Sequence, residues 1–207
     1  QITEINCSDL QIKSLEGLQY FDSLKELTCY QNEIAYLPSL PSKLESFICF
    51  SNELDSLPTL PHSLNTLICD GNHLTDLPPL PNTLIELQCN DNKLSALPTI
   101  PDSVKYLWCK NNQLENLPEL PPALKVLRCE NNQLTLLPSL PDSLIALSCA
   151  NNELESLPPI PSSVVQLFFS ENRVTNIPLA SNSRLISLHC TNNRIDSFHT
   201  LPNTLED

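Results

Sequence analysis

Glycine is almost absent from this sequence, which holds only Gly17 and Gly71 against 19 prolines. Ordinary domains contain more glycine than proline. The loops that cradle nucleotide phosphates, in dinucleotide-binding and P-loop motifs, need several closely spaced glycines. Two glycines so far apart cannot form such a loop, so the sequence argues against nucleotide binding.

Basic residues and long apolar runs are also scarce. The 24 acidic and 11 basic residues give a formal net charge of −13. Such a chain repels phosphate backbones and anionic head groups, so we expect neither nucleic acid nor a membrane surface as a partner. No segment approaches the roughly 18 to 20 apolar residues of a membrane span. The N-terminus lacks the layout of a secretion signal, which was either removed or never present.

A repeat fills the chain instead. Cysteines recur every 20 residues from Cys29 to Cys149, Cys7 lies 22 residues earlier, Phe169 takes the next position, and Cys190 follows after 21. Each unit reads LxxLxCxxNxLxxLPxLPxx. We therefore expect a single domain over residues 1–207 with about ten repeats: a first repeat of 22 residues, then repeats of 20, one of 21 near the end, and a truncated repeat at 201–207.

The unit itself predicts a strand followed by an extended return. The segment from Glu86 to Asn90 alternates polar and apolar residues, as a short strand does. All 19 prolines fall in the returns, where they favour polyproline-like backbone and exclude a helix. One coil cannot bury its leucines, so coils must stack. The predicted fold class is a leucine-rich-repeat solenoid with a parallel β-sheet on its concave face, extended or 3-10 convex returns, and little or no α-helix.

An asparagine follows each predicted strand, where the chain turns inward and leaves backbone groups away from water. Its side chain offers both donors and an acceptor, so we interpret the column as structural. Its members are Asn32, Asn52, Asn72, Asn92, Asn112, Asn132, Asn152, Asn172 and Asn193.

The cysteines occupy one inward position of the unit. Phe169 fills the same position, which indicates that the thiols serve as small apolar side chains. The sequence holds no CxxC, and a single-sulfur ladder does not make a tetrahedral zinc site. Redox or metal chemistry is the alternative. The structural series is Cys29, Cys49, Cys69, Cys89, Cys109, Cys129 and Cys149.

Catalytic residues, metal ligands and cofactors are not expected. The four histidines lie in different coils, and no serine or cysteine nucleophile is evidently paired with them. Most acidic residues are expected to form a solvating shell along turns and returns. The histidines are His62, His73, His189 and His199.

The run from Leu97-Pro98 through Pro101 to VxxLxCxxN at 104–112 resembles the short bacterial leucine-rich repeats of IpaH, SspH and YopM-type effectors. Residues 35–178 match that pattern closely, although those effectors more often place Val or Ile at the cysteine position. The first unit, with its segment from Ser14 to Leu18 and its length of 22 residues, is similar to internalin repeats. The combination of such a unit with cysteine at the sixth position is similar to secreted or surface repeat proteins of some bacteria.

This resemblance implies a bacterial virulence-type protein that is secreted, displayed on the cell surface or translocated into a host cell. Its partner would be a host or environmental protein. A helical hairpin usually precedes the repeats of such effectors, and the ligase subset carries a further catalytic domain. Neither is visible in this sequence, so no enzymatic activity is carried over.

The third, fifth and seventh positions of each unit should line the concave face, where repeat proteins bind ligands. Tyr, Trp and Arg are enriched in interface hot spots, so we predict a binding patch in the sixth and seventh units. In the alternative, lysine stems merely cover an aromatic cluster. This Trp108 patch comprises Tyr106, Trp108, Lys110, Val126 and Arg128, with Glu130, Lys105 and Lys125 beside it.

A second apolar group in the second to fourth units either binds a ligand or covers early coils in place of a cap. This Phe50 group comprises Tyr30, Ile48, Phe50 and Ile68. Phe168 and His189 are further candidates.

Three functions fit these patterns. The first is a protein-binding scaffold that engages its partner on the concave face. The second is the substrate-recognition arm of a larger, ubiquitin-ligase-like effector enzyme. The third is a self-assembling spacer, because Gln1 starts almost on a strand and the chain stops at Thr204–Asp207 as another unit begins, which leaves both ends without an evident cap.

Overall fold

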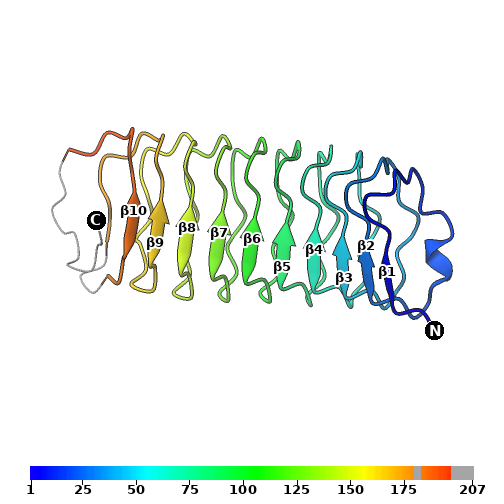
Figure 1. The fold of residues 1–207 in the computed structure, drawn as a ribbon. Coiled ribbons are helices and arrows are strands. Elements are labelled where there is room, and N and C mark those ends of the chain that lie inside the picture. Colours follow the sequence, from blue (N-terminus) through cyan, green and yellow to red (C-terminus); the bar gives the residue numbers. More distant parts are fainter. Residues whose placement is uncertain (180–182, 197–207) are drawn as a thin grey trace.

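The protein is a stack of short coils that share one continuous sheet (Figure 1). The computed structural model describes residues 1–179 and 183–196. Its ten strands follow one another in chain order, each parallel to the next. The truncated repeat expected at 201–207 and His199 lie outside the described residues. The strands are β1 (Glu4–Asn6), β2 (Glu26–Thr28), β3 (Ser46–Ile48), β4 (Thr66–Ile68), β5 (Glu86–Gln88), β6 (Tyr106–Trp108), β7 (Val126–Arg128), β8 (Ala146–Ser148), β9 (Gln166–Phe168) and β10 (Ser187–His189).

Equivalent residues of neighbouring coils lie side by side. Leu107 of β6 pairs with Leu87 of β5 and with Leu127 of β7. Backbone bonds continue beyond the strand ends, where the Cys89 N–H donates to the Trp108 carbonyl over 2.8 Å. Because parallel strands repeat in strict register, a residue type that recurs in the sequence forms a column along the solenoid.

The turn after each strand contains a residue with left-handed backbone. Gly71 has φ of 59° there, while Asp91 and Asn111 have 54°. Asparagine and aspartate tolerate this region better than other non-glycine residues. A Cβ at Gly71 would lie 3.5 Å from the Ser51 Oγ, an ordinary contact. The turn therefore does not depend on glycine, which explains how the chain folds with only two.

The core runs through the whole stack as one cluster of leucine, cysteine and related side chains from Leu18 to Leu185. The first coil differs, because a 3-10 helix, η1 (Leu18–Tyr20), replaces the proline return and follows Gly17, whose φ is 98°. No α-helix occurs among the residues that the structure describes. The predicted solenoid with a concave parallel sheet is thus confirmed.

Candidate interaction site on the concave face

The asparagine column holds the coils together beneath the concave face. Asn52 is 7% exposed, and its Nδ2 donates to the Cys29 carbonyl of the preceding coil (3.0 Å) and to the Cys49 carbonyl of its own coil (3.1 Å). Its Oδ1 accepts the Ile34 N–H over 3.1 Å. All nine predicted asparagines make bonds of this type.

The cysteine column lies directly inside the sheet. The seven thiols from Cys29 to Cys149 are buried, Cys7 and Cys190 are half-buried, and all nine are free. Burial raises the pKa of Cys29 to about 12 and also raises the pKa values of Cys7 and Cys190. A thiol reacts as its thiolate, so these shifts suppress reactivity at neutral pH.

Alkylation should therefore distinguish the ends of this column from its middle. In the folded protein at neutral pH we expect iodoacetamide to label only Cys7 and Cys190, and these slowly, because the other seven thiols are buried and these two are half-buried. Unfolding in denaturant should expose all nine. Peptide mass spectrometry of folded and denatured samples measures this, and rapid labelling of Cys89 or Cys109 in the folded state would contradict it.

The Trp108 patch occupies the middle of the sheet, on β6 and β7. The rings of Tyr106 and Trp108 stack with their centroids 5.8 Å apart. Trp108 lies beside Arg128 in register, and Tyr106 beside Val126. Arg128 is exposed, whereas the two aromatic rings, Val126 and Lys110 are half-buried. The structure thus brings the five predicted residues onto one surface.

The Phe50 group forms a second surface toward the N-terminal end. Tyr30 and Phe50 stack with ring centroids 4.4 Å apart and an interplanar angle of 7°. Ile48 pairs with Ile68 across β3 and β4. Farther along, Phe168 and His189 stack at 4.4 Å. The concave face therefore carries three separate aromatic clusters.

Sequence reasoning missed a small depression beside the Trp108 patch. It has a volume of about 90 Å³ and lies over Ala146 and Ser148 of β8, with Arg128 on one side and Phe168 on the other. Ala146 and Ala150 are the smallest side chains in the concave rows. Their size was the available signal, because a small residue between larger neighbours leaves a notch.

Asp70 departs from the expectation that acids are solvated. It is half-buried, and its Oδ1 accepts the Asn90 N–H over 2.6 Å. Asn90 repeats the arrangement, since its Oδ1 accepts the Lys110 N–H over 2.9 Å. Burial raises the pKa of Asp70, although the bonds from Asn90 oppose this rise.

Asp70→Asn should stabilise the protein modestly near neutral pH. The amide keeps an acceptor for the Asn90 N–H, as Asn90 does for Lys110, and removes the cost of burying a charge. Because the raised pKa of Asp70 makes the folded state bind its proton more tightly, wild-type stability rises as pH falls from the folded pKa toward the unfolded one. The advantage of the variant should shrink over that range in denaturant melts. A variant less stable than wild type at neutral pH would contradict this.

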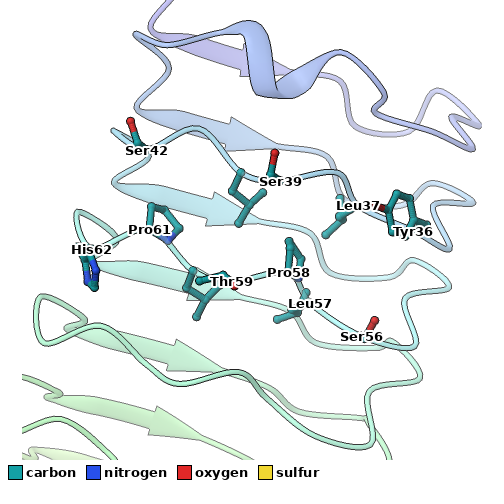
Figure 2. Close-up of a pocket in the computed structure, with 12 residues that line it drawn as sticks. Tyr36, Leu37, Ser39, Ser42, Ser56, Leu57, Pro58, Thr59, Pro61 and His62 are labelled. Atoms are coloured by element: carbon teal, nitrogen blue, oxygen red, sulfur yellow. The ribbon is translucent and has the colours of Figure 1, made fainter.

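A larger hollow lies on the opposite, convex face. Figure 2 shows it between two consecutive proline returns, residues 36–42 and 56–62. Its volume is about 690 Å³, and its walls are leucine, proline and hydroxyl side chains with Tyr36 at one end and His62 at the other. No acidic or basic residue other than His62 lines it. The repeat pattern is the same in every return, so the sequence held no signal for it.

The described part of the chain lacks both a metal-binding cluster and a membrane-spanning helix. It contains no group of three or more His, Cys, Asp or Glu side chains placed to hold a metal ion. It also contains no helix long and apolar enough to cross a membrane. His62, His73 and His189 lie in separate coils, as their sequence spacing predicted.

The stacked coils, the parallel concave sheet and the hydrogen-bonded asparagine column define a leucine-rich-repeat protein. Three solved structures are similar to it: YopM from Yersinia pestis, YopM from Yersinia enterocolitica WA-314, and a Shigella effector leucine-rich-repeat domain. No protein-family model matches the chain, and no curated protein matches it by sequence.

The Y. pestis YopM is 33% identical over 98% of this chain and 58% of its own, with a TM-score of 0.91. The Y. enterocolitica YopM is 35% identical over 90% and 46%, with a TM-score of 0.80. The Shigella domain is 37% identical over 70% and 67%, with a TM-score of 0.62. The chain belongs to the bacterial effector-type family of leucine-rich-repeat proteins, as its repeats predicted. It spans only about half the length of the two YopM chains.

Proposed function

We propose that this protein is a scaffold that binds another protein on its concave face, with Tyr106, Trp108 and Arg128 at the centre of the contact. The carrying observation is that these three residues lie together on β6 and β7, with Arg128 exposed and the rings only partly covered. Large aromatic side chains next to an arginine combine apolar contact area with directed hydrogen bonds.

The wider setting also supports this function. Membership of the effector-type family supports a protein-binding role, and it favours a place of action outside the bacterial cytoplasm, with a host protein as the partner. The concave sheet presents side chains from every coil to one ligand, and its rigidity limits the ordering cost of binding. The Phe50 group offers a second contact about three coils away.

Replacing Trp108 and Arg128 together by alanine tests the proposal. Both side chains project from the sheet, so the double variant should fold normally. The amount of partner protein that it retains should be lower than for wild type by about tenfold or more. Proteins retained from host-cell extract and from culture medium would be quantified by mass spectrometry.

The matched control replaces Tyr36 and Lys93 by alanine, which removes an aromatic residue and a base from exposed positions outside the Trp108 patch. It should retain what the wild type retains. Equal retention by all three proteins would remove the Trp108 patch from the interface. Failure of the folded wild type to retain any protein beyond an unrelated acidic control would contradict the scaffold function itself.

A further inference from the structure

We propose that the Trp108 patch takes an acidic, extended protein segment, whose carboxylates meet Lys105, Lys125 and Arg128 while an apolar side chain packs against Trp108. This inference rests on the proposed function and adds to it the chemical class of the partner. It starts from an uneven distribution of charge along an acidic molecule.

The bases of this chain gather at one place. Although the net charge is −13, four of the 11 basic residues lie in the sixth and seventh coils. They are Lys105, Lys110, Lys125 and Arg128. Side chains of like sign crowd together on a surface at a cost in stability unless something compensates for it.

In the part of the chain that the structure describes, three of the seven bases in the other coils are paired with an acid, whereas the remaining four are not. Among the described residues three ion pairs form between adjacent coils: Lys13 to Glu33 (3.2 Å), Lys25 to Glu45 (2.7 Å) and Arg173 to Glu153 (3.1 Å). In the last two pairs the base and the acid occupy equivalent repeat positions. None of the four bases around Trp108 takes part in such a pair.

Lys105 and Lys125 occupy the same repeat position as Lys25 and Glu45, four coils farther along. They are direct neighbours, because the Lys125 N–H donates to the Lys105 carbonyl over 2.8 Å. The residues on either side of them are Ile85 and Ile145, which carry no charge. Glu45 supplies a carboxylate to Lys25, but no described residue forms an ion pair with Lys105 or Lys125. A carboxylate of the partner can therefore take the place that Glu45 takes beside Lys25.

The Asp70 carboxylate is attracted electrostatically to Lys110, although no ion pair joins the two. Two further acids lie nearby, and neither forms an ion pair with these bases. The Glu86 Oε1 accepts a hydrogen bond from the Gln88 Nε2 over 2.7 Å. The Glu130 Oε2 is buried and has no hydrogen-bond partner. Neither carboxylate lies within ion-pair distance of Lys110 or Arg128. The patch therefore keeps a positive surplus within an acidic protein.

The order of residues along β6 sets the expected ligand. Lys105 precedes the strand, Lys110 follows it, and Tyr106 and Trp108 lie between. An extended run of this length covers on the order of 16 Å. A segment crossing the sheet along the strands would thus place acidic residues at both ends and an apolar residue in the middle. A long polyanion such as nucleic acid would also meet the acidic remainder of the molecule, which repels it.

The test measures binding of a short fluorescein-labelled peptide with glutamates at both ends and a central phenylalanine, by fluorescence anisotropy. Its matched peptide has glutamine at every glutamate. We expect the acidic peptide to bind about tenfold more tightly than the glutamine peptide, with an affinity that falls as salt rises.

The double substitution Lys105→Gln and Lys125→Gln should lower the affinity for the acidic peptide about tenfold. The matched control, Lys43→Gln with Lys93→Gln, removes two exposed bases outside the patch and should leave its affinity unchanged. Equal binding of the two peptides, an equal loss in the control variant, or tighter binding of a single-stranded oligonucleotide would overturn the proposal.

The scaffold function and the acidic partner can fail separately. If Trp108→Ala with Arg128→Ala abolishes protein capture while Lys105→Gln with Lys125→Gln leaves both capture and peptide affinity intact, the patch binds protein but its ligand is not acidic. If the lysine double variant lowers both the affinity for the peptide and the amount of captured protein, the acidic partner is supported.

Discussion

Leu107→Ala should lower the free energy of unfolding by about 2 to 5 kcal/mol, because it removes a fully buried side chain and leaves a cavity. Leu107 is 0% exposed at the centre of β6, between Leu87 and Leu127. In a solenoid each coil contacts only its two neighbours, so the cavity weakens both interfaces of the sixth coil. No other contacts can compensate.

The loss should also reduce cooperativity. Nearest-neighbour coupling holds the stack together, so a weak sixth coil allows the flanking coils to unfold in separate steps. We expect a lower midpoint and a shallower transition in urea, followed by circular dichroism. Leu136→Ala is the control: this leucine is 55% exposed, and its loss should change stability by no more than about 0.5 kcal/mol. Similar melts for the two variants would contradict the core assignment of Leu107.

The fold could be predicted from sequence because the repeat encodes it many times over. The buried leucine and cysteine positions follow directly from the spacing, and strict register carries each position into a column. Phe169 was informative, since a phenylalanine at the cysteine position predicted an apolar environment. Phe169 is indeed 0% exposed in the same column as the thiols.

Features that depend on differences between coils could not be predicted. The hollow on the convex face lies between two returns that share the repeat pattern LPxLP. The backbone bond from the Ile160 N–H to the Pro178 carbonyl lies where the ninth return loses that pattern. The burial of Asp70 depends on Asn90 in the next coil. Such contacts involve specific neighbours, and a repeat consensus averages them out.

For the Trp108 patch, the sequence predicted which residues share a surface but not how their charges are paired. The alternation of the strand placed Tyr106 and Trp108 on one face. Lys25 and Glu45 form an ion pair at the repeat position where Lys105 and Lys125 are both basic. This difference in pairing depends on side-chain contacts between coils, which the sequence pattern did not predict. Binding by the patch is still a prediction, and the variants above decide it.

Asn112→Ala is the second change with a large expected effect, a loss of about 1 to 3 kcal/mol. The Asn112 Nδ2 donates to the carbonyls of Cys89 (3.0 Å), Cys109 (3.2 Å) and Lys110 (3.1 Å). Its Oδ1 accepts the Leu94 N–H over 3.0 Å. Alanine removes both roles and leaves backbone groups in two coils without partners where water has little access.

The matched control is Gln113→Ala, whose side chain is exposed in the same turn. Both substitutions remove an amide, so the difference between their urea midpoints separates the effect of the Asn112 hydrogen bonds from any general effect of truncation. Asn112 bonds to the fifth coil as well as to its own, so Asn112→Ala and Leu107→Ala weaken the same interface. The double variant should therefore lose less unfolding free energy than the sum of the two single losses. Equal midpoints for Asn112→Ala and Gln113→Ala would show that the asparagine column does not hold the coils together.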